Sequence, residues 1–414
     1  MSTDLAACPI TGWAGFDQAT GDDPHCLYTR VRADGPVRPV VLADGRPAWI
    51  VTGYEEGRQA LLDPRLAKDI RTALGARPSL VTQGSQHPIF SHNLLFADGA
   101  DHSRLRRLIS AAFTPSRVAA MRPRIQAITD ELLDAVDDLA TRAPEEPVDL
   151  LARFALPLPI TVICELLGVP VADRPSLRSW FEAIFSNGVA PASDPVSRAA
   201  ADELYGYLCD LVAAKRREPG DDLLSALSAW VSDDRLSEAE LLSTAFVLIV
   251  AGHETTVNLI GNGVVALLRH PDQLARLRAD LTGVPRAVEE FLRYDGPVQH
   301  TTFRMTTEPV TLGGVEIPAH EQVLVVLAAA NRDPSRFTDA DTLDVDRHDT
   351  RHIAFGHGVH FCVGAPLARL EGEIAFTSLL QRFPKLRPAV RSGELHWTYR
   401  LVLRSLVSLP VLLR

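Results

Sequence analysis

The stretch FGHGVHFCVGAPLARLE, Phe355 to Glu371, places one cysteine between glycines, directly before a segment with helical periodicity. Gly356 and Gly358 permit a tight, irregular turn, and Gly364 lets another group approach the backbone closely. Cys362 is therefore expected at a helix N-terminus, where unpaired N–H groups and the helix dipole stabilise a thiolate. A thiolate held in this way is either a nucleophile or a metal ligand.

The spacing F-G-x-x-x-x-x-C-x-G would seldom arise by chance in this chain. With 15 Phe, 26 Gly and 5 Cys among 414 residues, the pattern is expected at roughly 2 × 10⁻⁶ per starting position, on the order of one chance in a thousand over the chain. An ordinary buried cysteine is the common alternative for a single thiol. The spacing favours a functional thiol at Cys362.

Composition narrows the class of protein. The chain has 414 residues, with 52 Asp and Glu against 42 Lys and Arg, a net charge of -10. That balance argues against nucleic acid as a partner, because phosphate binding needs a basic surface. The five cysteines include no C-x-x-C pair, which argues against a disulfide framework or a zinc ribbon. The first residues lack a signal-peptide pattern, and the apolar runs AFVLIVAG and VLVVLAAA are shorter than a membrane span. We therefore expect a cytoplasmic protein with no membrane partner.

Most of the chain has helical periodicity interrupted by proline. The segment from Leu241 to His270 is apolar almost all round and is expected to form a central buried helix, with a capped start at Ser237. Strand patterns are confined to three patches, near 38–53, 309–327 and 395–413. The first is expected to turn at Asp44-Gly45 and the second at Gly313-Gly314. The predicted fold class is mainly α with a small β-rich region (α+β), in a single domain over 1–414.

The cysteine stretch resembles the haem-binding loop of the cytochrome P-450 family, of the bacterial soluble type. The likeness runs from about Asp34 to Arg414. It implies the cytochrome P-450 fold, with haem b between the long central helix and the cysteine-loop helix. It also implies that Cys362 is the metal ligand, because the matching cysteine of the family is the axial thiolate of haem iron. Phe355 would pack against the sulfur side of the haem, and the N–H groups from Val363 to Ala365, Gly364 included, would donate to the sulfur.

Two further sets of residues match the family's haem environment. The family's E-x-x-R pair corresponds to Glu290 and Arg293, completed by an arginine from a later loop, Arg347. Taken alone, such a pair is an exposed ion pair of small effect; the resemblance makes the trio a structural network that holds the cysteine loop. The resemblance also implies a charge clamp for the haem propionates, formed by His102, Arg106, Arg304 and His360.

The segment AGHETT, 251–256, matches the family's oxygen-activation segment. The resemblance implies that Ala251 and Gly252 leave room for dioxygen, that Thr255 donates to bound oxygen, and that Glu254 relays protons. The residues alone also allow a helix kink with the threonines bonded to backbone carbonyls. Helical spacing places Val247 and neighbouring positions on one face, the expected ceiling of the site.

Candidate substrate contacts come from apolar content and from analogy with the family. They lie in a loop near 86–96, in a helix that ends near residue 185, on the central helix and in two C-terminal segments. These candidates are Leu94, Leu95, Phe185, Val247, Leu248, Val298, Gln299 and Leu401. Such a pocket suits a sizeable, mostly apolar molecule. One departure from the family is His320, where a glycine is usual.

The resemblance implies a monooxygenase that hydroxylates or epoxidises a polyketide-like, macrolide-like or other secondary metabolite with O2. No flavin or iron–sulfur motif is visible, so electrons from NAD(P)H are expected to arrive through a separate ferredoxin and ferredoxin reductase. Arg107, Arg117 and Arg124 could form a basic patch for that ferredoxin, while Arg104 is expected to be solvated. Three alternatives share some motifs: a haem-thiolate enzyme that couples or rearranges substrates without inserting oxygen, a non-catalytic haem sensor, and a globular protein with a structural thiol.

Overall fold

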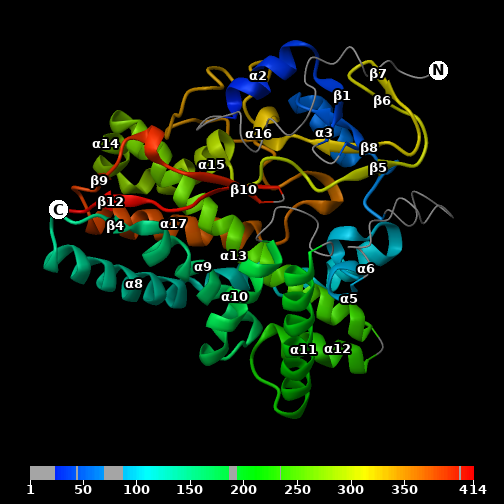
Figure 1. Cartoon of the computed structure of the whole chain (residues 1–414), viewed down its shortest axis with the longest axis horizontal. Coiled ribbons are helices and arrows are strands. Elements are labelled where there is room, and N and C mark those ends of the chain that lie inside the picture. Colours follow the sequence, from blue (N-terminus) through cyan, green and yellow to red (C-terminus); the bar gives the residue numbers. More distant parts are fainter. Residues whose placement is uncertain (1–23, 43–44, 70–86, 186–193, 234, 401) are drawn as a thin grey trace. The chain divides into compact units, whose positions relative to one another are not determined.

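The computed structural model describes residues 24–42, 45–69, 87–185, 194–233, 235–400 and 402–414 (Figure 1). Helices dominate, and the strands are short, as the sequence predicts. The chain forms two compact units. Unit 1 comprises Met1–Arg77, Gly261–Cys362 and Leu386–Val411; unit 2 comprises Pro78–Ile260, Val363–Lys385 and Leu412–Arg414. A single domain over the whole chain stays a prediction.

Unit 1 is built on a five-stranded sheet in the order β1-β2-β8-β5-β3. Antiparallel pairing joins β1 to β2, β5 to β8 and β3 to β5, whereas β2 and β8 run parallel. The strand bounds are β1 Val37–Val41, β2 Pro47–Val51, β3 Leu66–Ala67, β5 Arg304–Thr306 and β8 Gln322–Val325.

Alternate residues of this sheet enter two separate cores, because successive side chains of a strand point to opposite faces. Val51 and Val325 pack on one face with Tyr54 and Leu61 of α3 (Tyr54–Leu62). Ile50 packs on the other face with Tyr28 and Val31 of α2 (His25–Ala33). Both faces of the sheet are therefore covered within the unit, which explains its run of apolar residues.

The two predicted hairpins are confirmed at their glycines. β1 and β2 pair antiparallel across a turn in which Gly45 has φ +80°; Asp44 lies outside the described residues. β6 (Val310–Leu312) and β7 (Val315–Ile317) pair across Gly313 and Gly314, both in the left-handed region with φ +54° and +78°. Only glycine adopts this conformation at no steric cost. His320 stands where the family usually has glycine, and its φ of +65° lies in the left-handed region that favours glycine.

The rest of unit 1 consists of helices and a C-terminal hairpin. β10 pairs antiparallel with β11 in the third strand patch that the sequence indicates. The remaining bounds are α14 Pro271–Ala279, α15 Val284–Asp295, α16 Leu327–Ala330, β9 Arg387–Pro388, β10 Trp397–Arg400, β11 Leu403–Leu406 and β12 Pro410–Leu412.

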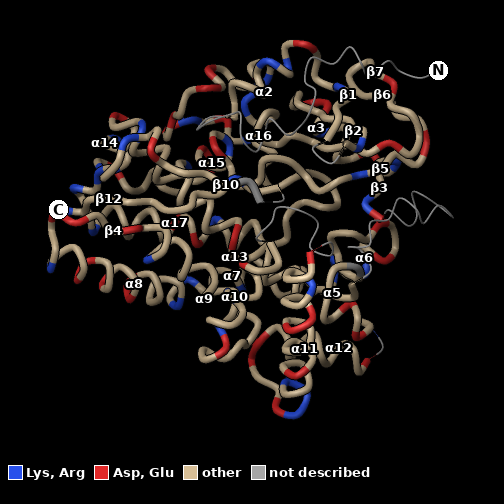
Figure 2. The backbone as a smooth tube through the Cα atoms, in the orientation of Figure 1, with Lys and Arg blue, Asp and Glu red and all other residues tan. Residues whose placement is uncertain are grey.

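Unit 2 is almost entirely helical within the described residues. α11 and α12 lie side by side (Figure 1), and α11 ends in a basic turn that stands out in Figure 2.

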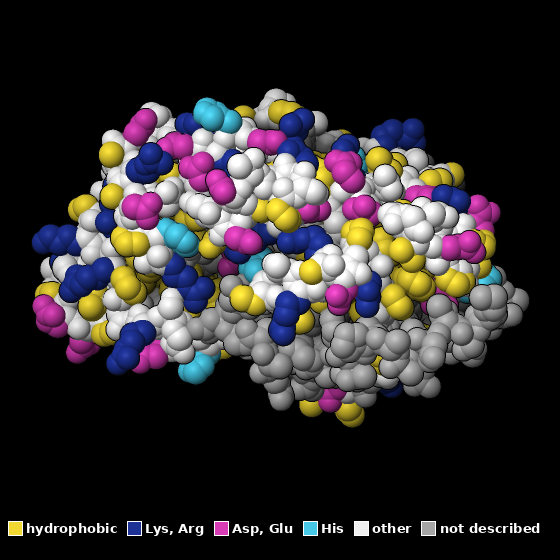
Figure 3. Space-filling view, turned by 90° about the horizontal axis from the view of Figure 1, so that it is seen from above, with side chains coloured by type: hydrophobic (Ala, Val, Ile, Leu, Met, Phe, Trp, Pro, Cys, Tyr) yellow, Lys and Arg dark blue, Asp and Glu magenta, His cyan; other side chains and the backbone are white. Residues whose placement is uncertain are grey.

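On the face of the protein shown in Figure 3, Lys and Arg are interspersed with Asp and Glu. The helix bounds are α5 Pro88–Ser91, η4 Leu94–Phe96, α6 Gly99–Ser110, α7 Pro115–Ala120, α8 Arg122–Arg142, α9 Pro157–Leu167, α10 Arg174–Phe185, α11 Pro195–Arg217, α12 Leu223–Ser232 and α17 Ala365–Arg382; the short strand β4 is Val148–Asp149.

The predicted central helix is α13, Glu238–Arg269. It starts with a reciprocal cap: the Ser237 N–H donates to Glu240, and the Glu240 N–H donates to the Ser237 hydroxyl. By length and composition this helix could cross a membrane, but 67% of its most apolar window is buried inside the protein. Such burial is typical of the core helix of a globular protein.

α17 carries a buried carboxyl group that predicts a pH-dependent stability. Glu371 is 1% exposed, and burial raises its pKa from 4.5 to about 8. Between these pH values the folded protein keeps a proton that the unfolded chain has released, so stability falls as pH rises. The expected slope is up to about 1.4 kcal/mol per pH unit. Glu371→Gln is expected to lose this slope, which denaturant titrations at pH 5.5 and 7 would measure; equal slopes in both proteins would contradict the assignment.

Candidate functional site

The cysteine loop of unit 1 is a compact turn. The Cys362 N–H donates to the Phe355 carbonyl at 2.9 Å, and the Phe361 N–H donates to the Gly358 carbonyl at 3.0 Å. Gly356 and Gly358 both have φ +74°, which explains the two glycines. The chain therefore turns back on itself immediately before the thiol.

Helix α3 supports this loop, a contact that the sequence does not predict. A Cβ built on Gly358 would lie 3.0 Å from the Leu61 carbonyl oxygen, so only glycine fits there. Arg58 Nη2 lies 3.5 Å from His357 Nε2, and burial, followed by the charge of Arg58, lowers the His357 pKa. Within unit 1 the loop is thus packed against the end of α3.

The Cys362 thiol shares its exposure with Cys26 among the described cysteines, but only Cys362 lies in the glycine-rich loop before α17. It is exposed and lies three residues before α17, whose N-cap is Gly364 and whose first turn contains a proline, as predicted. Cys164, by contrast, is buried, and burial raises its pKa to about 11. A buried thiol of that kind is inert. The exposed thiol before a long helix suits a donor group.

The predicted trio of Glu290, Arg293 and Arg347 is present as a buried network in unit 1. Arg293 donates to both oxygens of Glu290 at 2.7 and 2.8 Å, and Arg347 donates to Glu290 at 3.1 Å. The side chains of Glu290 and Arg293 are 0% exposed. Charges at such depth are stable only when paired and hydrogen-bonded.

This network holds a different segment from the one expected. The two arginines donate to carbonyls between residues 331 and 342, and the Asp344 N–H donates to Glu290. The connection to the cysteine loop is indirect: Asn331 Oδ1 accepts from the Ile353 N–H at 2.8 Å. The trio thus fixes the 331–347 segment directly, and the cysteine loop only through it.

On α13, the AGHETT segment has one exposed position, Ala251. The Thr255 hydroxyl donates to the Ala251 carbonyl at 2.7 Å, the backbone bonding that the residues alone allowed. His253 is 5% exposed, and burial lowers its pKa to about 4, so it is neutral at physiological pH. The Glu254 carbonyl accepts from Asn258. The polar groups of this segment are therefore distributed around the helix rather than gathered on one face.

The structure gives Gly252 a packing role, and its expected place beside dioxygen stays a prediction. A Cβ built there would lie 2.9 Å from Cδ1 and Cγ1 of Ile163, a buried residue of α9. The missing side chain makes room for the packing of α9 against α13. Sequence spacing cannot reveal this, because it does not say which helix covers a given face.

Gly252→Ala is expected to destabilise the fold. The added methyl overpacks the α9–α13 contact at a cost of about 1–3 kcal/mol, and the better helix propensity of alanine offsets about 1 kcal/mol of it. Denaturant titration would measure the change, with Gly206→Ala in α11 as a control, because a Cβ at Gly206 meets nothing within 4 Å. Equal effects at the two sites would contradict the packing explanation.

The four predicted cationic residues divide between the units. His102 and Arg106 lie on α6 of unit 2, with His102 4% exposed. Arg304 and His360 belong to unit 1, where Arg304 is 5% exposed and Nη1 donates to the Leu66 carbonyl at 3.1 Å. Two of these residues, His102 and Arg304, are thus buried bases.

Two other arginines differ from expectation. Arg104 is not simply solvated, because it donates to Glu240 of α13 and to the Arg235 carbonyl. Arg124 donates to both oxygens of Glu165 at 2.8 Å, so its charge is neutralised locally. Of the three arginines proposed for a ferredoxin surface, Arg107 and Arg117 remain as exposed candidates.

The candidate substrate residues of unit 2 include two on a short helix that is well anchored. Leu94 and Leu95 lie in η4, half-buried. The preceding Asn93 donates to the buried hydroxyl of Ser243 at 3.0 Å, and that hydroxyl donates to the Ile89 carbonyl at 2.8 Å. Asn93 and Ser243 thus position η4 on α13, a role that the sequence does not predict for either residue.

The other predicted substrate contacts differ in how deeply the structure buries them. Phe185 is buried at the end of α10, while Val247 is half-buried and Leu248 buried on α13. Val298 forms a bridge with Leu403, and Leu401 lies outside the described residues.

Gln299 has a structural role instead of the expected one. It is 2% exposed, its Oε1 accepts from the Tyr28 hydroxyl at 2.9 Å, and its Nε2 donates to the Gly296 carbonyl at 3.0 Å. Both ends of the side chain amide are therefore used within unit 1, which corrects its assignment as a substrate contact.

Comparison with known proteins gives consistent matches along the chain. The cytochrome P450 family model matches residues 212–391. Cytochrome P450 107B1 of Saccharopolyspora erythraea is 49% identical over 96% of this chain and 96% of its own length. From the same organism, 6-deoxyerythronolide B hydroxylase is 45% identical over 94% of this chain and 96% of its own length. The tirandamycin C-bound P450 monooxygenase TamI superposes with a TM-score of 0.87 at 44% identity, over 98% of this chain and 100% of that one.

Proposed function

This chain belongs to the cytochrome P450 family, and on that premise we propose that it hydroxylates or epoxidises a mostly apolar secondary metabolite, polyketide-like or macrolide-like, with O2. It is an oxidoreductase of the bacterial secondary-metabolite type. The observation that carries the proposal is the exposed Cys362 thiol in a tight loop directly before α17. The relative named as a hydroxylase supports oxygen insertion.

The cofactor of the family is haem b, and the donor set of this chain fits it. Cys362 offers the thiolate; its N–H donates to the Phe355 carbonyl, and Gly364 follows two residues later. His102, Arg106, Arg304 and His360 offer cationic or hydrogen-bonding groups for two propionates, and the burial of His102 and Arg304 suits an anionic partner. When bound, the haem supplies reductive activation of dioxygen, assisted by electron donation from the thiolate.

We assign proton handling to Thr255 and Glu254. The Thr255 hydroxyl has one proton and two lone pairs. While the hydroxyl donates its proton to the Ala251 carbonyl in a hydrogen bond, its oxygen can accept a second hydrogen bond. Rotation about χ1 would turn the hydroxyl away from the helix backbone. Glu254 is half-buried one position before Thr255, where a carboxylate can exchange protons with solvent.

Thr255→Ala is expected to uncouple the reaction, with NADH consumption kept and oxygen diverted to peroxide. A loss of about tenfold or more in product per NADH is expected from one general acid–base group. Peroxide and product yield, measured with the same redox partners, would check this. The control is Thr256→Ala, the neighbouring buried threonine; an unchanged yield in Thr255→Ala would restrict the residue to a helical role.

Enzymes of this family receive electrons from NAD(P)H through redox partners. We propose that the partners of this chain are a ferredoxin and a ferredoxin reductase. Arg107 and Arg117, exposed on α6 and α7, are the candidate contacts for an acidic ferredoxin. A cytoplasmic location, with no membrane and no nucleic acid as partner, completes the proposal. Its basis is the acidic composition, together with a long apolar helix that is largely buried.

The proposed reaction is tested by a ligand screen followed by product analysis. Compounds that shift the haem absorbance identify the substrate class, and turnover under ¹⁸O2 then follows. A product that carries one labelled oxygen supports the proposal. An unlabelled product would instead establish a reaction without oxygen insertion: oxidative coupling removes two hydrogens, whereas a rearrangement leaves the mass unchanged.

A further inference from the structure

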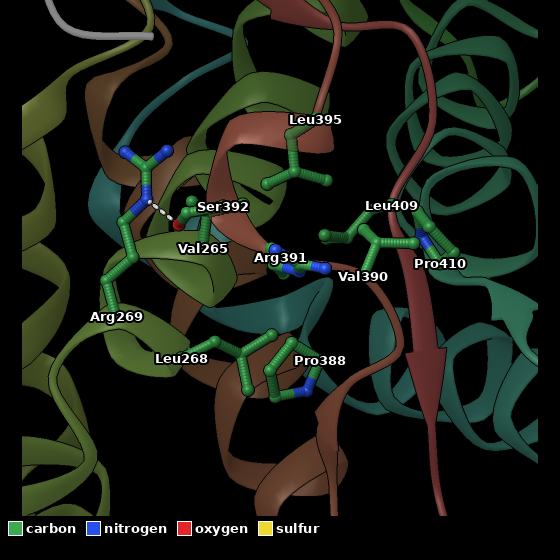
Figure 4. Close-up of a pocket in the computed structure, with 10 residues that line it drawn as sticks. All are labelled: Val265, Leu268, Arg269, Pro388, Val390, Arg391, Ser392, Leu395, Leu409 and Pro410. Carbon is green, nitrogen blue, oxygen red and sulfur yellow. Dashed lines mark hydrogen bonds between the residues drawn. The ribbon is translucent and has the colours of Figure 1, made fainter.

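A cavity in unit 1 is lined by none of the residues assigned to the reaction. Its volume is about 210 Å³, and its walls come from the last turns of α13, the segment from Pro388 to Leu395, and the start of β12 (Figure 4). Val265, Leu268, Leu395 and Leu409 make the interior apolar. Cavities for drug-sized ligands measure about 300–1,000 Å³, so this cavity suits a smaller molecule.

Two arginines give the cavity a cationic side. Arg269 Nε donates to the Ser392 hydroxyl at 2.6 Å (Figure 4), and Arg391 precedes that serine. The Arg391 side chain is 92% exposed. Its nearest acidic group, Glu394, is held mainly by the Arg391 backbone N–H at 2.9 Å, with the charged groups 4.0 Å apart. Among the described residues that line the cavity, none is Asp or Glu.

We propose that this cavity binds a small amphiphilic carboxylate, with its alkyl tail between the leucines and its carboxylate beside Arg269 and Arg391. A guanidinium matches a carboxylate with two parallel hydrogen bonds. The Ser392 hydroxyl already accepts from Arg269, so its own proton is directed away from that guanidinium and can add a third donor. An uncharged ligand of the same length has no charge to pair with the two guanidinium groups. The inference is independent of the proposed reaction.

The test uses octanoate and the haem-loaded protein saturated with imidazole, so that any octanoate that disturbs the iron ligand appears as a change in the Soret band. Isothermal titration is expected to show saturable octanoate binding with a Kd below about 1 mM and an unchanged Soret band. Octan-1-ol is expected to bind at least about fivefold more weakly. Arg269→Gln and Arg391→Gln are each expected to weaken octanoate binding about fivefold, the effect of one exposed charge pair.

Two further variants separate cavity binding from general charge effects. Arg387→Gln removes an exposed arginine of β9 that does not line the cavity, and binding is expected to be unchanged. Leu395→Trp fills the apolar interior while keeping both arginines, and binding is expected to be lost. The inference is overturned if imidazole-saturated wild type shows no saturable binding, if octan-1-ol binds as tightly as octanoate, or if Arg387→Gln weakens binding as much as Arg269→Gln and Arg391→Gln.

Discussion

Cys362→Ser is expected to abolish the strongly red-shifted Soret band that the reduced, carbon-monoxide-treated protein shows, and to reduce turnover below about one per cent of wild type. A hundredfold loss corresponds to about 2.7 kcal/mol of transition-state stabilisation. The physical reason is that a serine hydroxyl donates electrons to the haem iron far more weakly than a cysteine thiolate at the same position. The Cys362 N–H bond to Phe355 belongs to the backbone, so the loop is expected to keep its shape.

The matched control is Cys26→Ser, because Cys26 is also an exposed thiol of unit 1 but lies on α2, outside the loop. Its spectrum and turnover are expected to equal those of wild type. Haem content, measured after extraction, separates a changed ligand from lost cofactor. A Cys362→Ser protein that keeps the wild-type reduced carbon-monoxide spectrum would remove the basis of the proposed function.

Local backbone requirements made the strands and the cysteine loop predictable. The turns at Gly45, at Gly313-Gly314 and at Gly356 all have positive φ, a requirement that leaves a visible trace in the sequence. The start of α13 was equally visible, because a Ser and a Glu three residues apart form a reciprocal cap. In each case the signal and its structural cause lie within a few residues of each other.

The contacts that the sequence did not predict join distant segments. Gly252 is small because of Ile163, and Gln299 is polar because of Tyr28, 271 positions away. Ser243 anchors η4 through groups about 150 residues away. No periodicity encodes such a partner, and a polar residue in an apolar helix suggests a ligand and a structural bond equally. Family resemblance supplied the type of site, but not these individual contacts.

Arg293→Leu is expected to lower the free energy of unfolding by about 3–5 kcal/mol, because removing one member of a buried ion network leaves uncompensated charge. Glu290 would remain 0% exposed with Arg347 as its remaining cation. The carbonyls of Asn331, Ala340 and Thr342 would also lose a charged donor. A loss of this size consumes much of the stability of a typical domain, so the variant is expected to fold but to unfold at clearly lower denaturant.

A comparison with Arg124→Leu shows whether burial or hydrogen-bond geometry determines how much stability is lost. Arg124 also donates to both oxygens of a carboxylate, at 2.8 Å each, yet its side chain is 52% exposed. Water and salt screen such a pair, so its loss is expected to cost no more than about 1 kcal/mol. Denaturant midpoints of the haem-loaded variants, measured by circular dichroism, would compare the two. If both changes cost the same, the 331–347 segment is not held by the network, and the indirect link through Asn331 to the cysteine loop loses its foundation.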